Sequence, residues 1–179
     1  MNDSVGGVFE VIVLGLLPGL GSYVQADRRL DAQIAQAVMG IQAIKGVEFG
    51  MGFACGEHFG TNVHDEIYYN ETKRFFRKTN ASGGLEGGIS TGEPLVTRAV
   101  MKPIPTVKKS LKTVDIVTKK SVPALHERSD VCAVPSAAIV AEAVIAIQIV
   151  TVFFEKFGGD CLFDIKESVA TYAHRLRTF

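Results

Sequence analysis

Glycine is concentrated in one short stretch of this chain, and that stretch limits the possible folds more than any other. Five glycines fall within residues 83–92, in the order Gly-Gly-Leu-Glu-Gly-Gly-Ile-Ser-Thr-Gly. Glycine tolerates positive φ angles, and it has no Cβ atom to keep a neighbouring group at a distance. Such a run is typical of a tight turn, or of a loop whose N–H groups bind phosphate or a polar ring edge. The glycines alone leave both interpretations open.

Two further segments carry groups that bind anions. Lys102-Pro-Ile-Pro-Thr106 offers an amine, a hydroxyl and a main chain that its prolines hold extended. Arg128-Ser-Asp130 offers a guanidinium, which binds phosphate or carboxylate with two hydrogen bonds, beside a carboxylate able to accept a proton. We expect both segments to converge with the glycine loop on one ligand. The alternative is that Arg128 and Asp130 form an ordinary surface ion pair.

The predicted strands and helices alternate in blocks without regular βαβ spacing, which predicts an α+β fold, with an antiparallel sheet packed against a layer of helices. Asp27 is predicted to cap a helix whose apolar stripe extends to Ile41 and Ile44 and which stops at Gly46. No repeat or linker divides the chain, so residues 1–179 are expected to form one domain. Strands are predicted at 8–14, 47–49, 66–69, 94–101 and 113–118.

The most apolar segment, residues 133–154, is long enough to cross a membrane. Glu142 lies near its middle, where a carboxylate costs about 2.5–3.5 kcal/mol in a bilayer. Pro135 suits the first turn of a helix, and Gly158-Gly159 suits its end. We therefore expect a buried core helix rather than a membrane span, followed by an amphipathic helix that begins at Asp160.

Charge and cysteine content narrow the function classes. The 19 basic and 19 acidic residues cancel, so neither nucleic acid nor an anionic membrane is an expected partner. Three cysteines without regular spacing indicate reduced thiols and a cytoplasmic location, and Cys132 is expected to be buried and inert. Cys55, His58 and His64 match no standard zinc spacing, so no metal is expected.

Several blocks together resemble chorismate synthase. They are Gly19-Leu-Gly-Ser-Tyr-Val-Gln25, Ile41-Gln-Ala-Ile-Lys-Gly-Val-Glu48, the run from Gly83 to Pro94, Met101-Lys-Pro-Ile-Pro-Thr106 and the run from Glu127 to Pro135. They occur in the family's order and cover nearly the whole chain, weakening after about Phe157. All belong to the C-terminal half of the family sequence, and the two catalytic histidines of the N-terminal half have no counterpart among the four histidines here.

The resemblance implies a reaction and a cofactor. Members of this family convert 5-enolpyruvylshikimate 3-phosphate to chorismate and phosphate by a 1,4-trans elimination that requires reduced FMN. In the matching blocks Asp130 stands where the family has a carboxylate near the flavin, which helps a ring nitrogen to take up the substrate proton. The residues that the resemblance assigns to FMN are Gln42, Ala43, Gly87, Lys102, Pro103, Ile104, Pro105, Thr106 and Arg128.

The resemblance also implies partners. The family fold is a β-α-β sandwich that assembles as a homotetramer, and half of it leaves apolar helix faces open. We therefore expect this chain to dimerise, or to pair with a complementary N-terminal half, and to be inactive alone on its phosphorylated substrate. The alternative is a non-catalytic module left from a truncated gene, which only binds flavin or self-associates.

Overall fold

The computed structural model describes residues 3–107, 109–125 and 130–179, so Arg128 lies outside the described residues. Three strands form the main sheet, in the order β1 (Gly7–Val13), β7 (Leu95–Met101) and β2 (Ile44–Phe49). Within these described residues the α-helices are α1 (Leu30–Met39), α2 (Val134–Phe157) and α3 (Leu162–Thr178). The shorter strands pair as three hairpins, namely β3 (Ile67–Asn70) with β4 (Arg74–Arg77), β5 (Leu85–Glu86) with β6 (Ile89–Ser90), and β8 (Lys112–Val114) with β9 (Ser121–Pro123).

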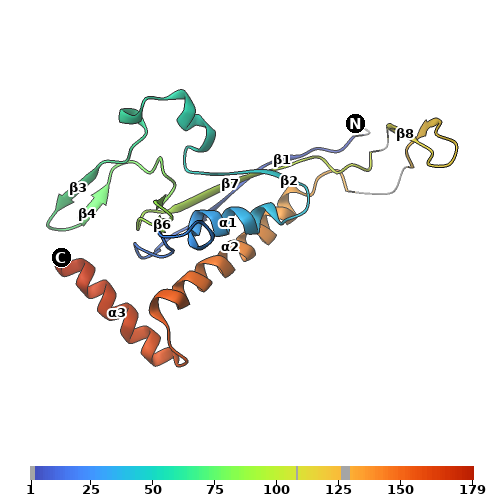
Figure 1. Ribbon diagram of the computed structural model, residues 1–179. Coiled ribbons are helices and arrows are strands. Elements are labelled where there is room, and N and C mark those ends of the chain that lie inside the picture. Colours follow the sequence, from blue (N-terminus) through green and yellow to red (C-terminus); the bar gives the residue numbers. More distant parts are fainter. Residues whose placement is uncertain (1–2, 108, 126–129) are drawn as a thin grey trace.

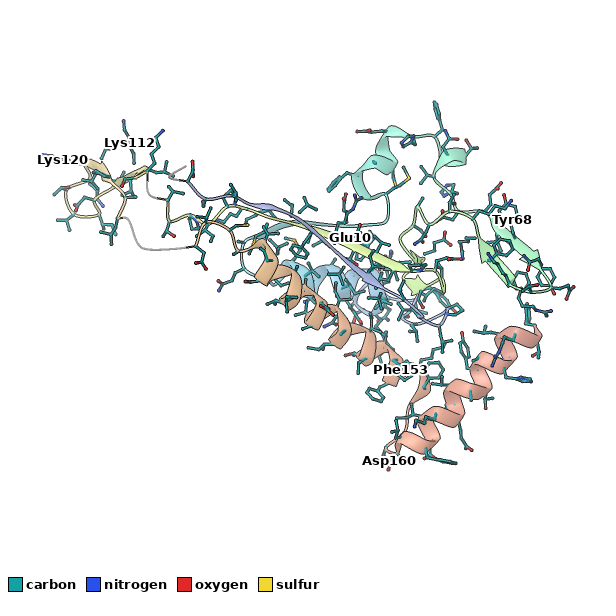
Figure 2. The ribbon with its side chains drawn as sticks, turned by 180° about the vertical axis from the view of Figure 1, so that it is seen from behind. Glu10, Tyr68, Lys112, Lys120, Phe153 and Asp160 are labelled. Carbon is teal, nitrogen blue, oxygen red and sulfur yellow. The ribbon has the colours of Figure 1, made fainter. Side chains whose placement is uncertain are left out.

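The main sheet is antiparallel throughout, which confirms the predicted class. Strand β7 lies in the centre, and its side chains alternate between a buried and an open face. Leu95, Thr97, Ala99 and Met101 point into the core, as a period of two requires. On the open face Glu10 and Glu48 flank Arg98, and Figure 2 shows Glu10 on the side of the sheet away from the helices.

Helices α1 and α2 cover the other face of the sheet (Figure 1). Leu30, Ile34 and Val38 lie on one side of α1 and are fully buried, as residues spaced by four on a helix should be when one stripe faces the core. Helix α2 contacts both α1 and β1, and the small residues Ala137 and Ala141 are buried on its inner face.

Helix α2 differs from the predicted buried helix because only one of its faces lies in the core. It is long and apolar enough to cross a membrane by length and composition, and only 22% of its most apolar window is buried. Ile139, Val140 and Ile147 are exposed on the opposite face. The predicted ends are confirmed, since Pro135 lies in the first turn and Gly158 ends the helix with a φ of 54°.

The predicted helix from Asp27 to Gly46 was wrong at both ends. Asp27 lies in a short 3-10 turn, Ala26–Arg28, and α1 begins at Leu30 and ends before Gly40. Ile44 continues the helical apolar spacing, but it pairs with Met101 at the start of β2. Sheet pairing therefore overrides the helical periodicity in the last part of the predicted helix.

The other predicted strands agree only in part with the strands of the structure. Strand β3 appears near residues 66–69, and its partner β4 was not predicted. The predicted strand at 113–118 is wrong in its second half, because the chain turns after Val114. Asp115 causes this turn by accepting hydrogen bonds from the N–H groups of Val117 and Thr118. Two further 3-10 turns, Gly52–Glu57 and Gly60–Asn62, connect β2 to β3.

Candidate functional site

The Met101 end of the main sheet brings several of the predicted site residues together. The Lys102 N–H donates to the carbonyl of Ala43 at 2.9 Å, so two predicted segments far apart in sequence are in direct contact. Gln42 precedes Ala43 in the turn between α1 and β2, and its side chain is exposed. We call this cluster, residues 42–43 with residues 102–106, the Lys102 end.

The N-terminal segment packs against the Lys102 end. The Ser4 hydroxyl donates to the carbonyl of Ile104 at 2.5 Å. A Cβ atom on Gly6 would lie 2.3 Å from the Met101 carbonyl oxygen, so only glycine fits beside this turn. The Val5 N–H donates to the carbonyl of Val131 at 2.9 Å, which brings the segment after Asp130 to the same end.

Asp130 itself is exposed, next to Val131. The alternative to a binding role, an ion pair between Arg128 and Asp130, depends on Arg128, which lies outside the described residues. The flavin contact predicted for Arg128 and the catalytic role predicted for Asp130 therefore stay predictions.

The backbone of Ala43 is strained. Its φ is 67°, a left-handed conformation that costs a residue with a Cβ atom about 1–2 kcal/mol relative to the right-handed one. Such strain persists only where the surroundings enforce it, and it is found most often at ligand sites. The exposed amide of Gln42, the exposed amine of Lys102 and the turn at Ala43 together suit an anionic, planar group.

The glycine stretch lies at the opposite end of the main sheet. All five of its glycines have positive φ angles, so the conformational part of the prediction is confirmed. A Cβ atom on Gly83 would lie 2.2 Å from the Gly50 nitrogen, and one on Gly88 would lie 2.6 Å from the Ser22 carbonyl oxygen. These two glycines are required by close approach of the chain to itself. At Gly87, by contrast, the space around a Cβ atom is open.

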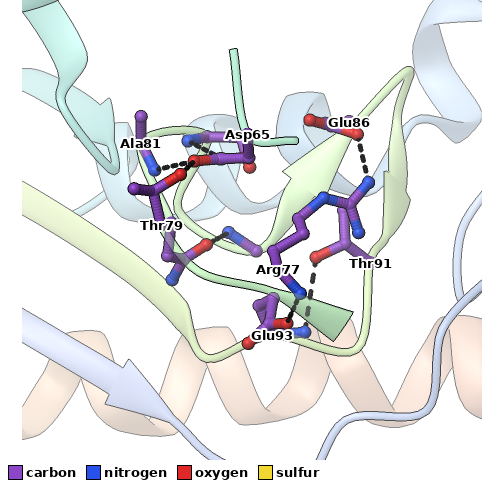
Figure 3. A network of polar contacts seen from close by, with 10 residues as sticks. Asp65, Arg77, Thr79, Ala81, Glu86, Thr91 and Glu93 are labelled. Carbon is purple, nitrogen blue, oxygen red and sulfur yellow. Dashed lines mark hydrogen bonds and ion pairs between the residues drawn. The ribbon is translucent and has the colours of Figure 1, made fainter. Parts of the chain in front are cut away.

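A buried carboxylate holds the glycine stretch in place (Figure 3). Asp65 is 7% exposed and accepts hydrogen bonds from the Thr79 hydroxyl at 2.6 Å and from the N–H groups of Ala81 and Ser82 at 2.8 and 2.9 Å. Burial raises the pKa of the Asp65 carboxyl, but these hydrogen bonds outweigh burial and hold the pKa below its ordinary value. The side-chain oxygen of Asn80 accepts a further hydrogen bond, from the Gly84 N–H at 2.8 Å.

The expected convergence of all three segments does not occur within the one chain. The glycine stretch joins the start of β7, since the Val96 N–H donates to the Gly83 carbonyl. Lys102 follows the other end of this seven-residue strand, which spans about 20 Å at 3.3 Å per residue. Helix α1 also spans the distance between the two ends. At its start the Leu30 N–H donates to the Gly88 carbonyl of the glycine stretch, and Ala43 of the Lys102 end follows the end of the helix. Gly87 is therefore remote from the Lys102 end.

The sequence prediction missed the residues that support these two ends. Asp65 follows His64 in the sequence, and His64 was considered only as a metal ligand. Ser4 and Gly6 lie in an N-terminal segment in which no motif was recognised. Within the described residues, no group of three His, Cys, Asp or Glu side chains is placed to hold a metal ion. The Cys132 thiol, which was predicted to be buried, is exposed, because it precedes α2 rather than facing the core.

Comparison with known proteins gives a consistent result. The family model described as chorismate synthase matches residues 1–154. The curated chorismate synthase of Geobacter metallireducens is 56% identical over 99% of this chain and 47% of its own length, and that of Aquifex aeolicus is 51% identical over 99% and 45%. A crystal structure of chorismate synthase superposes with a TM-score of 0.83 at 45% identity, covering 99% of this chain and 45% of that one. The chain spans about half the length of the curated relatives that it matches.

Proposed function

This chain belongs to the chorismate synthase family, and we propose that it forms the C-terminal half of a flavin-dependent active site. The proposed reaction converts 5-enolpyruvylshikimate 3-phosphate to chorismate and phosphate by a 1,4-trans elimination, in the cytoplasm. The observation that carries the proposal is the hydrogen bond between Lys102 and Ala43, because it joins two segments that the family resemblance assigns to the same cofactor.

The residues of the Lys102 end would hold reduced FMN through charge and shape. The Lys102 ammonium would stabilise the negative charge of the reduced ring, and the Gln42 amide would bond a polar ring edge. The prolines of residues 102–106 keep this wall of the site extended, so the ring meets a preformed surface. When bound, reduced FMN supplies an electron that assists the departure of phosphate and recovers it when the substrate loses a proton.

Asp130 would hold the proton at the flavin ring. Its carboxylate is exposed in this chain. Asp130 directly precedes Val131, whose carbonyl accepts a hydrogen bond from the Val5 N–H. The family resemblance assigns Arg128 to the same flavin, where a guanidinium would stabilise the negative charge of the ring.

Gly87 would contact a flavin that is held by the Lys102 end of a second copy of the chain. A flavin ring held by Ala43 and Lys102 cannot reach past helix α1 to Gly87 of the same chain. The open space at Gly87, which its neighbours Gly83 and Gly88 lack, suits the approach of a ring from another molecule. We therefore propose a homo-oligomer in which each site takes Lys102 from one copy and Gly87 from the other.

The exposed apolar face of α2 supports a further partner. Ile139, Val140 and Ile147 form a stripe whose burial would contribute about 25 cal/mol per Å². We propose that residues 1–179 form one domain, half of a β-α-β sandwich, and that the N-terminal half of the family sequence covers this stripe and supplies the catalytic histidines. The alternative is a module that binds flavin or self-associates without catalysis.

An anaerobic assay of chorismate formation tests the proposal. The chain is supplied with reduced FMN and 5-enolpyruvylshikimate 3-phosphate, either alone or mixed with the separately expressed N-terminal half of the Geobacter metallireducens relative. We expect turnover only in the mixture. Turnover by the chain alone would contradict the proposed inactivity, and flavin binding without turnover in the mixture would favour the non-catalytic alternative.

A lysine pair makes the test specific to the site. Lys102→Gln should weaken binding of reduced FMN by about tenfold or more, as the loss of a charge-assisted hydrogen bond predicts. Lys112→Gln removes the same charge from strand β8, outside the proposed contacts, and should leave flavin affinity unchanged. Equal losses in the two variants would indicate general electrostatic attraction rather than a site at Lys102.

A further inference from the structure

A groove outside the proposed flavin site lies between helix α3 and the β3–β4 hairpin. Its volume is about 680 Å³, within the range of small-molecule sites. Helix α3 runs back from the end of α2 towards the hairpin (Figure 1). The Tyr172 hydroxyl anchors it by donating to the Pro18 carbonyl at 2.8 Å, and the rings of Phe179 and Phe75 lie 6.4 Å apart. The groove is therefore built between elements that contact each other.

The floor of the groove is apolar and aromatic. Phe75 is 55% exposed and Phe179 is 87% exposed, although phenylalanine is usually buried. Phe76, Ile67 and Leu17 extend the same surface. Clustered exposed apolar side chains in a concave surface are typical of a ligand site.

The rim of the groove is positively charged. Lys73, Arg74 and Arg77 line it from the hairpin, and Arg177 lines it from α3. Glu93 is the one carboxylate side chain in this lining, and its carboxylate already accepts a hydrogen bond from the Arg77 N–H at 3.1 Å. Because the whole chain has a net charge of zero, this groove concentrates positive charge that is balanced elsewhere.

Two of the four cations lack a carboxylate partner. Arg77 pairs with Glu86 at 2.7 Å and Arg74 with Glu71 at 3.6 Å, whereas Lys73 and Arg177 form no ion pair within the described residues. These two line the same groove from its two walls. The Lys73 ammonium lies 5.3 Å from the centroid of the Phe76 ring, and the Arg177 guanidinium donates to the Ala173 carbonyl at 3.3 Å. An anion placed between them would give both cations a charged partner.

We propose that this groove is a second binding site, for a small planar aromatic carboxylate. The ring of the ligand packs on Phe75 and Phe179, and its carboxylate lies between Lys73 and Arg177, since a guanidinium matches a carboxylate in geometry. The site is independent of the flavin proposal. Helix α3, which forms one wall of the groove, lies beyond residue 154, where the match to the family model ends.

Ligand titration of the full 179-residue chain tests the site, with 2-naphthoate as probe and the uncharged 2-naphthamide as charge control. We expect saturable binding of naphthoate, at least about tenfold tighter than that of the amide, because charge-assisted hydrogen bonds are lost in the amide. In a two-dimensional NMR titration, the amide signals of residues 73–77 and 173–179 should shift most.

An arginine pair on α3 supplies matched variants. Arg177→Gln should weaken naphthoate binding by about tenfold, whereas Arg175→Gln, two residues away on a different face, should not. Arg175 contacts the Tyr172 ring and lines another surface of the helix. The proposal is overturned by equal affinity for the acid and the amide, by equal losses in the two variants, by shifts elsewhere, or by the absence of saturable binding.

Discussion

Asp65 and Asp115 accept the same set of hydrogen bonds in two very different regions of the molecule. Each takes one bond from a threonine hydroxyl and two from backbone N–H groups. Asp65 is buried under the glycine stretch, while Asp115 turns the β8–β9 hairpin that projects beyond the Lys102 end (Figure 1). The same local chemistry thus fixes a packed scaffold in one region and shapes an open arm in the other.

The difference between the two regions indicates which residues maintain the fold and which residues bind the ligand. The glycine stretch is the most conspicuous feature of the sequence, yet most of it serves close approach of the backbone to itself. Most of the proposed flavin contacts gather instead at the exposed Lys102 end, where few side chains are buried, and Gly87 is the one proposed contact from the glycine stretch. Rigid, buried glycines support the site, and an open surface binds the ligand.

The largest expected effect comes from Gly83→Ala. Its Cβ atom would meet the Gly50 nitrogen at 2.2 Å and the Gly50 Cα at 2.7 Å, and neither backbone atom can move away. Together with the cost of a positive φ, we expect the free energy of unfolding to fall by about 3 kcal/mol or more.

Gly87→Ala is the matched control, because its φ is also positive but its surroundings are open. It should cost about 1 kcal/mol, since conformational strain is partly offset by a less flexible unfolded state. Urea denaturation followed by circular dichroism measures both. Equal losses would show that close packing does not distinguish the two glycines.

The next effect compares the two aspartates. In Asp65→Asn, an amide N–H₂ group replaces one carboxylate oxygen and faces buried donor groups without being able to accept from them. The free energy of unfolding should therefore fall by about 2–3 kcal/mol. Asp115→Asn, with the same partners near solvent, should change the urea midpoint much less. A similar shift in both variants would contradict the assignment of the glycine stretch as the packed region.

The pH dependence of stability tests the Asp65 carboxylate directly. The pKa of Asp65 is lowered in the folded chain, so its contribution is present above the unfolded pKa of about 3.9 and is lost as pH falls through the folded pKa. Urea midpoints measured from pH 6 down to pH 3 should therefore fall less steeply in Asp65→Asn than in the parent chain. An unchanged slope would mean that the Asp65 carboxylate adds no acid-sensitive stability.

The smallest expected effect lies at the Lys102 end. Ala43→Gly relieves the strain of a φ of 67° but makes the unfolded chain more flexible, so stability should rise by less than about 1 kcal/mol. Ala43→Val should instead destabilise, since a β-branched residue fits the left-handed region poorly. Thermal unfolding of the two variants checks this order, and a more stable valine variant would contradict the conformation described for Ala43.

Local sequence signals predicted some parts of this structure and missed others for physical reasons. Proline and glycine placed both ends of α2, and a short β-branched run between glycine-rich turns placed β1, because these signals act over a few residues. Ile44 was assigned to a helix because its pairing with Met101 depends on a distant strand. The support from Asp65 and the separation of Gly87 from Lys102 depend equally on long-range packing, which no local pattern contains.

One mixing experiment tests the central claim, that the two ends of the sheet serve one flavin only across two copies of the chain. Lys102→Gln and Gly87→Asn are prepared separately, asparagine being chosen because it tolerates a positive φ. Each variant is combined with the N-terminal half, and binding of reduced FMN is measured before and after the two variants are mixed and allowed to reassemble.

Each variant alone should bind FMN weakly. After mixing, about a quarter of the sites should recover full affinity, because half of randomly formed pairs are hybrids and each hybrid contains one unaltered site. If the mixture binds no more FMN than the separate variants, Lys102 and Gly87 do not act across two copies, and the central claim is wrong.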